Sequence, residues 1–234
     1  MQQVISKDGT SASPTTKLTR AVLACGIVAG PLWIVVVLIQ MLIRPGFDLR
    51  YDEASLLSNG NLGWIQITNF VVTGLLVIAC AVGMRRVLRG GRGRAWGSLL
   101  VGVYGLGTIG AGIFIADPMN GFPVGTPMGA PHIISWHGNL HVIAGMLGFL
   151  ALIAGCFVFA RRFAALKQRG WAAYSVATGV IFFAAVAGIA VGSQQQGAIQ
   201  IFVNLAFFVA VVLGWAWVSA MAAKLLMEQR RTSA

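Results

Sequence analysis

The sequence predicts an all-α membrane protein, an up-and-down bundle of six transmembrane helices with both chain ends in the cytoplasm (N-in/C-in). Of the 234 residues, 57% are hydrophobic and only 10% are charged, and the mean hydropathy is +0.81. A soluble domain carries about 25% charged residues, so this chain is too poor in charge to cover a water-facing surface. Six apolar runs are each long enough to cross the roughly 30 Å of hydrocarbon in a bilayer.

Each apolar run is predicted to be a helix, because lipid offers no hydrogen-bond partner to a bare backbone N–H or C=O group. Strands of a membrane barrel would be shorter and would alternate apolar with polar residues, which these runs do not. Residues 1–20 are predicted to be a disordered cytoplasmic tail, residues 21–223 the transmembrane domain and residues 224–234 a second cytoplasmic tail. The predicted spans are Ala21–Ile43, Trp64–Met84, Ala95–Ala116, Asn139–Ala160, Trp171–Gly192 and Ala198–Ala223.

The orientation follows from the basic residues in the connections. Lys and Arg gather in the N-terminal tail, in residues 85–94, in residues 161–169 and in the C-terminal tail. The first connection holds only Arg44 and Arg50, and the third and fifth hold no Lys or Arg. Positive charge marks cytoplasmic loops, so both ends are predicted inside. We therefore attribute the net charge of +11 to membrane topology and expect membrane lipids, not nucleic acid, as partners. We also expect a multi-pass protein of a bacterial cytoplasmic membrane.

Polar residues within the spans lie mostly in the predicted outer half. Polar groups are costly in a bilayer unless they meet each other or water. Two interpretations stay open: a polar pocket that opens outward beneath the two long outer loops, or hydrogen bonds between adjacent helices. On the first interpretation the candidate ligand-binding residues are Ser55, Trp64, Gln66, Asn69, Gln200 and Asn204. The outer turn after the fifth span, Ser193, Gln194, Gln195 and Gln196, is polar at the same depth.

The three histidines, His132, His137 and His141, fall within ten residues. His137 and His141 are spaced i, i+4 and share a helix face, and Asp117 ends the third span on the same side. Together these residue types can perform general acid–base catalysis, and Asp52 or Glu53 is a further candidate proton donor. A zinc site is the other chemistry that His and Asp allow, but one segment supplies all the histidines, so no metal ligand is assigned.

Other catalytic and cofactor signatures are missing from the sequence. It contains no GxSxG, no P-loop and no dinucleotide-binding glycine motif after a strand, so no cofactor is predicted. No acidic or basic residue lies near the middle of a span, which argues against an ion-coupled transporter. Gly26 and Gly30, and again Gly188 and Gly192, form GxxxG pairs. Such pairs pack helices within one chain or join two copies, so a homodimer stays possible.

The outer loops contain a series of short motifs: RPGFD at 44–48, SLL at 55–57, GNLGW at 60–64, IFIADP at 113–118 and HGNLH at 137–141. In their order and placement these motifs resemble the bacterial domain-of-unknown-function 998 family. The resemblance runs from about Ala21 to Ala223 and implies a membrane fold of six helices, without supplying an activity. It marks as positions of interest Ser55, Gly63, Trp64, Asp117, Pro118, His137 and His141.

Two functions therefore remain open. The first is a protein without catalytic activity, whose outward pocket binds a lipid, an isoprenoid or another small amphiphile. The second is a membrane-embedded hydrolase or proton-initiated cyclase acting on a hydrophobic substrate through Asp117, His137 and His141. The second requires those three side chains to meet around one cavity that is open to solvent.

Overall fold

The computed structural model describes residues 14–88, 90, 93–131, 133–192 and 197–232. This part of the chain is helical and has no strand, only an isolated bridge between Met119 and Phe122. The all-α class is thereby confirmed. The elements in chain order are α1 Pro14–Ile43, the 3-10 helix η1 Ala54–Ser58, α2 Gly63–Val87, the π-helical turn η2 Gly93–Gly97, α3 Ser98–Ile113, α4 Trp136–Ala165, α5 Arg169–Gly192 and α6 Ala198–Thr232.

Six helical segments in the described residues are long and apolar enough to cross a membrane. They coincide with the predicted spans, but several boundaries differ. Helix α1 begins at Pro14 and α6 continues to Thr232, so the described parts of both predicted tails are helical. Proline suits a first helical position because it has no N–H to leave unpaired there. Residues 1–13, His132 and residues 193–196 lie outside the described residues.

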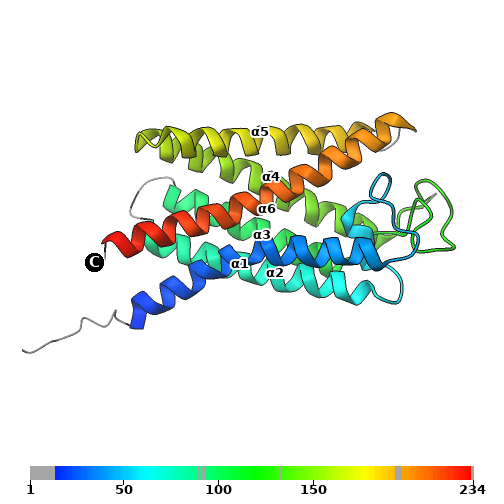
Figure 1. The fold of residues 1–234 in the computed structure, drawn as a ribbon, viewed down its shortest axis with the longest axis horizontal. Helices are drawn as coiled ribbons and strands as arrows, with labels where there is room; N and C mark the ends of the chain where they lie inside the picture. Colours follow the sequence, from blue (N-terminus) through cyan, green and yellow to red (C-terminus); the bar gives the residue numbers. More distant parts are fainter. Residues whose placement is uncertain (1–13, 89, 91–92, 132, 193–196, 233–234) are drawn as a thin grey trace, which may run out of the picture.

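The helices form a closed ring. Each packs against the next along the chain, and α6 returns to pack against α1. The start of α1 and the end of α6 consequently lie at the same end of the bundle (Figure 1). We call this the basic end, because most of the described basic residues lie there: Arg85, Arg86, Arg94, Arg161, Arg162, Lys167, Arg169, Lys224, Arg230 and Arg231. The loop end is the opposite end, which carries the long connections 44–62 and 114–135.

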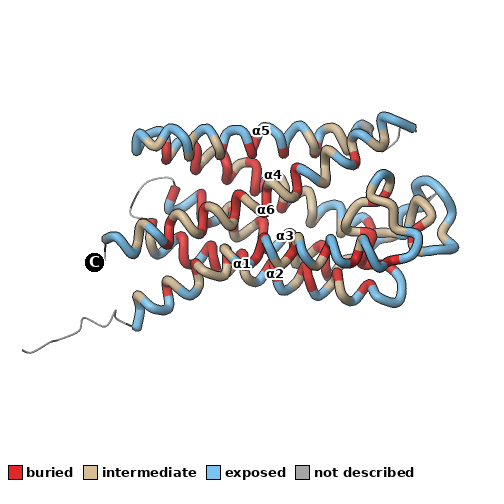
Figure 2. The backbone as a smooth tube through the Cα atoms, in the orientation of Figure 1, coloured by how far each residue is buried: buried red, intermediate tan, exposed pale blue. Residues whose placement is uncertain are grey.

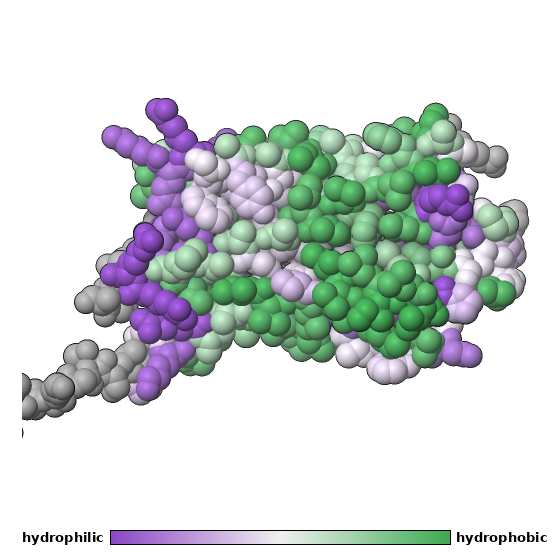
Figure 3. All heavy atoms as spheres, in the orientation of Figure 1, coloured by the Kyte–Doolittle hydropathy of each residue, from purple (hydrophilic) through white to green (hydrophobic). Residues whose placement is uncertain are grey.

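The outer surface of the bundle between its two ends is apolar. Buried residues face the interior of the ring (Figure 2), and hydrophobic residues cover the middle of the molecule (Figure 3). An exposed apolar surface of this extent is stable only against lipid or a partner, which agrees with an integral membrane protein. The large exposed side chains on these helices include Leu38, Val72, Leu106, Leu147, Phe183 and Phe202.

Small residues let the helices approach closely. A Cβ atom added at Gly107 of α3 would lie 2.6 Å from the Ala144 carbonyl oxygen of α4. A Cβ atom at Gly30 would lie 2.7 Å from the Trp215 carbonyl oxygen, so α1 and α6 also nearly touch. Close backbone approach is the usual basis of helix association in lipid. The GxxxG pair of α1 therefore serves packing inside this chain.

Candidate ligand-binding cavity

The first connection folds over the loop end and is held there by a buried arginine. Arg44 is only 7% exposed, and its Nη1 donates to the Leu57 carbonyl oxygen at 3.0 Å. Its Nη2 donates to the carbonyl oxygen of Asn59, and the guanidinium lies 5.1 Å from the centre of the Phe122 ring. From the sequence, the charge of Arg44 was interpreted as an indicator of membrane topology. Its actual role is to fix η1 and the chain after it across the bundle.

The second long connection supports the first. Asn120 Nδ2 donates to the Tyr51 carbonyl oxygen at 2.8 Å, and Asn59 Nδ2 donates to the Ala116 carbonyl oxygen at 3.1 Å. The rings of Phe47 and Phe122 meet edge to face with centroids 5.4 Å apart. The two long connections therefore cover the loop end in two layers, and the first connection is the inner layer.

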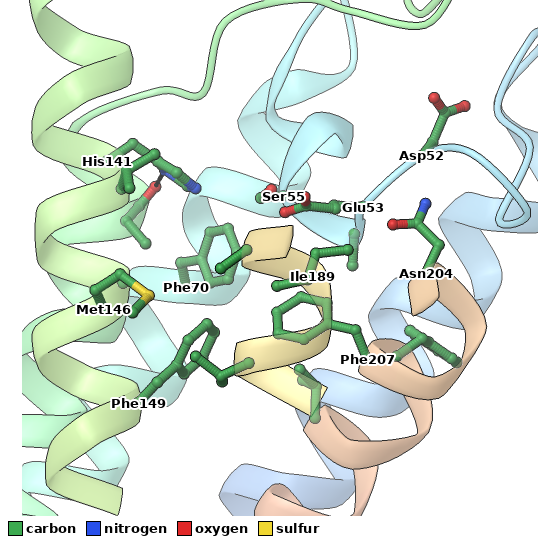
Figure 4. Close-up of a pocket in the computed structure, with 18 of the residues that line it drawn as sticks. Asp52, Glu53, Ser55, Phe70, His141, Met146, Phe149, Ile189, Asn204 and Phe207 are labelled. Carbon is green, nitrogen blue, oxygen red and sulfur yellow. Dashed lines mark hydrogen bonds between the residues drawn. The ribbon is translucent and has the colours of Figure 1, made fainter. Parts of the chain in front are cut away.

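A cavity of about 290 Å³ lies beneath this cover. Its size is near the lower limit of small-molecule sites, which span about 300–1,000 Å³. The first connection forms its roof, and residues from all six helices line it near the loop end. The polar groups are concentrated at the top of the cavity (Figure 4). The residues used below are Asp52, Glu53, Ser55, His141, Gly145, Met146, Phe149, Asn204 and Phe207.

The lower part of the cavity is apolar, and the sequence analysis did not anticipate it. Helix α4 presents His141, Gly145 and Phe149, spaced i, i+4, and α6 presents Asn204, Phe207, Phe208 and Val211, spaced i, i+3, i+4 and i+7. Each set continues along one helix face from a polar residue that had been selected from the sequence. Extending this spacing along each helix would have predicted the apolar residues that line the lower part of the cavity. An added Cβ at Gly145 would meet nothing within 4 Å, so this glycine leaves the space open.

Glu53 is the carboxyl group best placed to meet a ligand. It directly precedes η1, makes no capping hydrogen bond with its side chain, and points into the cavity (Figure 4). Burial raises the pKa of Glu53 above its ordinary value, because a charged carboxylate is costly away from water. No described residue forms an ion pair with it, since the described ion pairs are those of Asp48 and Glu228.

Asp52 and Asn204 lie at the other side of the roof. Asp52 is 1% exposed, and its Oδ2 accepts a hydrogen bond from the backbone N–H of Asp48 at 2.8 Å. Burial raises the pKa of Asp52 to about 6. The Oδ1 atom of Asp52 and the Nδ2 atom of Asn204 are buried and have no hydrogen-bond partner within the described chain. A buried polar atom without a partner is costly, so both atoms favour an added polar group or water.

His141 is fixed with one nitrogen bound and the other facing the cavity. Its Nδ1 lies 2.8 Å from the Phe114 carbonyl oxygen and 3.0 Å from the Ala111 carbonyl oxygen. Both partners are acceptors, so Nδ1 must carry the proton. In the neutral ring Nε2 is then the acceptor, and the ring points toward Ser55 and Glu53 across the cavity (Figure 4).

The structure does not bring Asp117, His137 and His141 together. Asp117 Oδ2 accepts from the backbone N–H of Ser135 at 2.8 Å, beside the first turn of α4, where a carboxylate also suits the helix dipole. A Cβ atom at Gly138 would collide with this carboxylate, so Gly138 leaves room for it. His137 is exposed and packs on Trp136. Only His141 of the three lines the cavity.

Gln66 and Asn69 face α1, away from the cavity. Gln66 Oε1 accepts from Gln40 Nε2 at 2.8 Å and from Asn69 Nδ2 at 3.3 Å. Asn69 Nδ2 also donates to the Trp33 carbonyl oxygen at 3.3 Å. We call Gln40, Gln66 and Asn69 the amide seam. These residues follow the second interpretation of the sequence, in which polar groups join adjacent helices.

The remaining candidates lie outside the cavity wall. Trp64 lies in the first turn of α2 and is 62% exposed, as expected of an aromatic residue at a membrane interface. Gln200 is half-buried near the start of α6 and does not line the cavity. Ser55 does line it. Across the described ranges, no cluster of three or more His, Cys, Asp or Glu residues is arranged to hold a metal ion.

Comparison with protein families identifies one match. The family model described as "Protein of unknown function (DUF998)" matches residues 27–224. The match covers most of the chain, so the chain belongs to this family, and the resemblance predicted from the loop motifs is confirmed. No curated protein and no solved structure matches the chain.

Proposed function

Starting from its membership of the DUF998 family, which carries no assigned activity, we propose that this membrane protein binds a small amphiphile in the loop-end cavity. The polar end of the ligand lies under the first connection, and its apolar part lies among Met146, Phe149 and Phe207. The observation that carries the proposal is the Glu53 side chain. It is a carboxyl group without an ion-pair partner in the described chain, directed into a mostly apolar hollow.

The charges of the roof define the class of ligand. Asp52 and Glu53 are both acidic, and among the described residues that line the cavity only His141 can carry positive charge. The two nearby arginines are engaged elsewhere, Arg44 with loop carbonyls and Arg50 with Asp48 at 2.6 Å. An anionic head group would be repelled, whereas a hydroxyl or a protonated amine would donate to the acceptors present. The ligand is therefore an amphiphile whose polar end donates hydrogen bonds.

Matched ligands test this assignment. 1-Decanol, decylamine and decanoate share one tail and differ in the head group. We expect decanol and decylamine to raise the melting temperature of the protein in an uncharged detergent in a saturable manner, because binding only to the folded form stabilises it. Decanoate should have no effect beyond that on the detergent itself. Equal stabilisation by all three compounds would contradict the proposal.

Gly145→Leu provides the variant for this experiment. The new side chain enters the open space beside Gly145 and should weaken decylamine binding by at least about tenfold. The helix itself should tolerate the change, since leucine is a better helix former than glycine. Gly170→Leu is the matched control, because Gly170 of α5 also has open space around its Cβ position and lies at the basic end. A Gly145→Leu protein that still binds decylamine as the wild type does would refute the site.

A second function, catalysis on a hydrophobic substrate, is favoured by the arrangement of His141 and Glu53. The unprotonated Nε2 of His141 and the carboxyl group of Glu53 approach one cavity from opposite sides (Figure 4). An imidazole and a carboxyl group can together move a proton during hydrolysis. Asp117 and His137 play no part in this version, because their side chains lie elsewhere.

Ester hydrolysis tests the second function. The probe is p-nitrophenyl octanoate in uncharged detergent, compared between the wild type and the variants His141→Phe and Glu53→Gln. Catalysis predicts a rate lowered by at least about 100-fold in each variant, the usual contribution of a positioned acid or base. Equal rates in all three proteins would exclude this hydrolysis while leaving amphiphile binding intact.

A further inference from the structure

A second hollow lies at the basic end, and its lining differs from that of the loop-end cavity. It has a volume of about 630 Å³ and is bounded by α1, α2, α4 and α6. Hydrophilic residues gather at this end of the molecule (Figure 3). The lining residues that bear on the argument are Thr15, Arg86, Leu88, Arg162, Leu225 and Arg231.

Three arginines from three helices meet around this hollow. Arg86 comes from the end of α2, Arg162 from the last turn of α4 and Arg231 from the end of α6. None of them forms an ion pair with an acidic residue of the described chain, where the ion pairs are Arg50–Asp48 and Lys224–Glu228. Like charges repel, so this arrangement favours an anion between them.

One acidic residue, Glu228, lines the hollow together with the three arginines, but its carboxylate has other partners. Glu228 is engaged by Lys224 Nζ at 2.9 Å and by Gln168 Nε2 at 3.3 Å. The other acidic residues in the described ranges, Asp48, Asp52, Glu53 and Asp117, belong to the loop end. The net charge around the hollow therefore stays positive.

The arginines border an apolar floor. Leu88 and Leu225 are 2% and 3% exposed, and both line the hollow. The stem of Arg162 packs closely against η2, where a Cβ atom at Gly93 would lie 2.8 Å from Arg162 Cδ. Gly93 thus makes room for the side chain that extends from α4. A charged rim over an apolar floor at a membrane boundary suits the junction between a phosphate and its acyl chains.

We propose that the hollow lined by Arg86, Arg162 and Arg231 is a binding site for a phosphate group. Guanidinium groups bind phosphate through paired, charge-assisted hydrogen bonds. The phosphate belongs either to the head group of an anionic lipid or to a free phosphate ion. This site is separate from the loop-end cavity, at the opposite end of the bundle, and does not depend on what binds there.

The sequence provides a matched control for each arginine. Arg85, Arg161 and Arg230 directly precede the three lining residues, lie at the same end of the bundle, and do not line this hollow. We therefore compare the triple variant Arg86→Gln/Arg162→Gln/Arg231→Gln with Arg85→Gln/Arg161→Gln/Arg230→Gln. Both lose three positive charges, so they differ only in whether the hollow itself is altered.

The measurement is the titration of the full chain with phosphatidylglycerol in an uncharged detergent at physiological salt, followed by native mass spectrometry. The lining variant should bind at least about 30-fold more weakly than the wild type, because charge-assisted hydrogen bonds to three arginines are lost. The control variant should change by less than about threefold, since exposed charges outside the site are screened by salt. Equal losses in both variants would overturn the proposal, because they would indicate a diffuse surface charge.

Two further titrations distinguish the sources of the phosphate. Phosphatidylcholine with the same acyl chains tests whether the net charge of the head group matters, and inorganic phosphate tests the free ion. Saturable binding of phosphatidylglycerol alone identifies a lipid head group, and binding of inorganic phosphate at comparable affinity identifies a free anion. No saturable binding of either anion to a folded wild-type protein would also overturn the proposal.

Discussion

Two polar regions at the same end of the bundle have opposite relations to their surroundings. In the amide seam, Gln66 is 0% exposed and its Oε1 accepts hydrogen bonds from Gln40 and Asn69, while its Nε2 has no partner within the described chain. In the loop-end cavity, Glu53 and Asn204 line a hollow; Glu53 has no ion-pair partner among the described residues, and Asn204 Nδ2 has no hydrogen-bond partner there. The seam joins α1 to α2, while the cavity is left open by Gly145 and its neighbours. A polar residue in a membrane helix therefore indicates a site only when the facing helices leave space.

We expect the largest effect on stability from a substitution that disrupts the amide seam. Gln66→Leu removes the acceptor for Gln40 and Asn69 and leaves both buried amides without that partner. We expect the free energy of unfolding to fall by about 2 kcal/mol, with decylamine binding unchanged. Unfolding in mixed micelles measures the change. Gln200→Leu is the matched control, because this half-exposed glutamine should tolerate the same substitution, and an equal loss in both variants would contradict the seam.

We expect a smaller effect, on ligand binding, from a substitution in the loop-end cavity. Asn204→Leu removes an amide whose Nδ2 has no partner in the described chain, so stability should stay the same or rise slightly. Decylamine and decanol should each bind about fivefold more weakly, the loss of roughly one hydrogen bond of about 1 kcal/mol. Melting curves with and without each ligand give both quantities. If stability falls as in Gln66→Leu, Asn204 belongs to the packing of the bundle instead.

The smallest expected effect concerns pH and the roof. The pKa of Asp52 is raised by burial from 3.8 to about 6, so the folded form holds a proton that the unfolded form releases in this interval. The contribution of Asp52 to stability is therefore present below about pH 4 and is lost as the pH rises through about 6. We expect the melting temperature to fall by about 2 °C across this range because of Asp52.

The Asp52→Asn variant isolates this contribution. Asparagine keeps an oxygen that can accept from the backbone N–H of Asp48 but does not titrate. The melting temperature of the wild type minus that of the variant should be highest at low pH. It should fall as the pH rises toward 6 and stay constant above about pH 6. Subtracting the two melting temperatures cancels the effects of Glu53 and Asp48, because these residues titrate in both proteins. A difference independent of pH would show that Asp52 is not buried as described.

The sequence anticipated the helices and part of the site for different reasons. Each predicted span coincides with a helix long and apolar enough to cross a membrane, because crossing hydrocarbon demands a long apolar run. Helices α1 and α6 extend beyond the predicted spans, because a polar segment can remain helical and hydropathy does not mark where a helix ends. His141, Asn204, Ser55, Asp52 and Glu53, all candidates from the sequence, line one cavity at the loop end. Asp117 and Gln66 were grouped with them because depth in the membrane can be read from the sequence, whereas the direction of a side chain around its helix axis cannot.

The fold class, the positions of the membrane helices and the separation of a basic end from an acidic one could be predicted from the order of the amino acids. Hydropathy and charge govern these properties, and both act on lipid and water whichever segments pack nearby. The packing of the helices was needed to show that Gln66 bonds to another helix, that Asp117 anchors α4, and that Glu53 and His141 share a hollow. The reason is that partners and empty space arise from how several helices pack, and closely packed backbones leave room only where facing side chains are small.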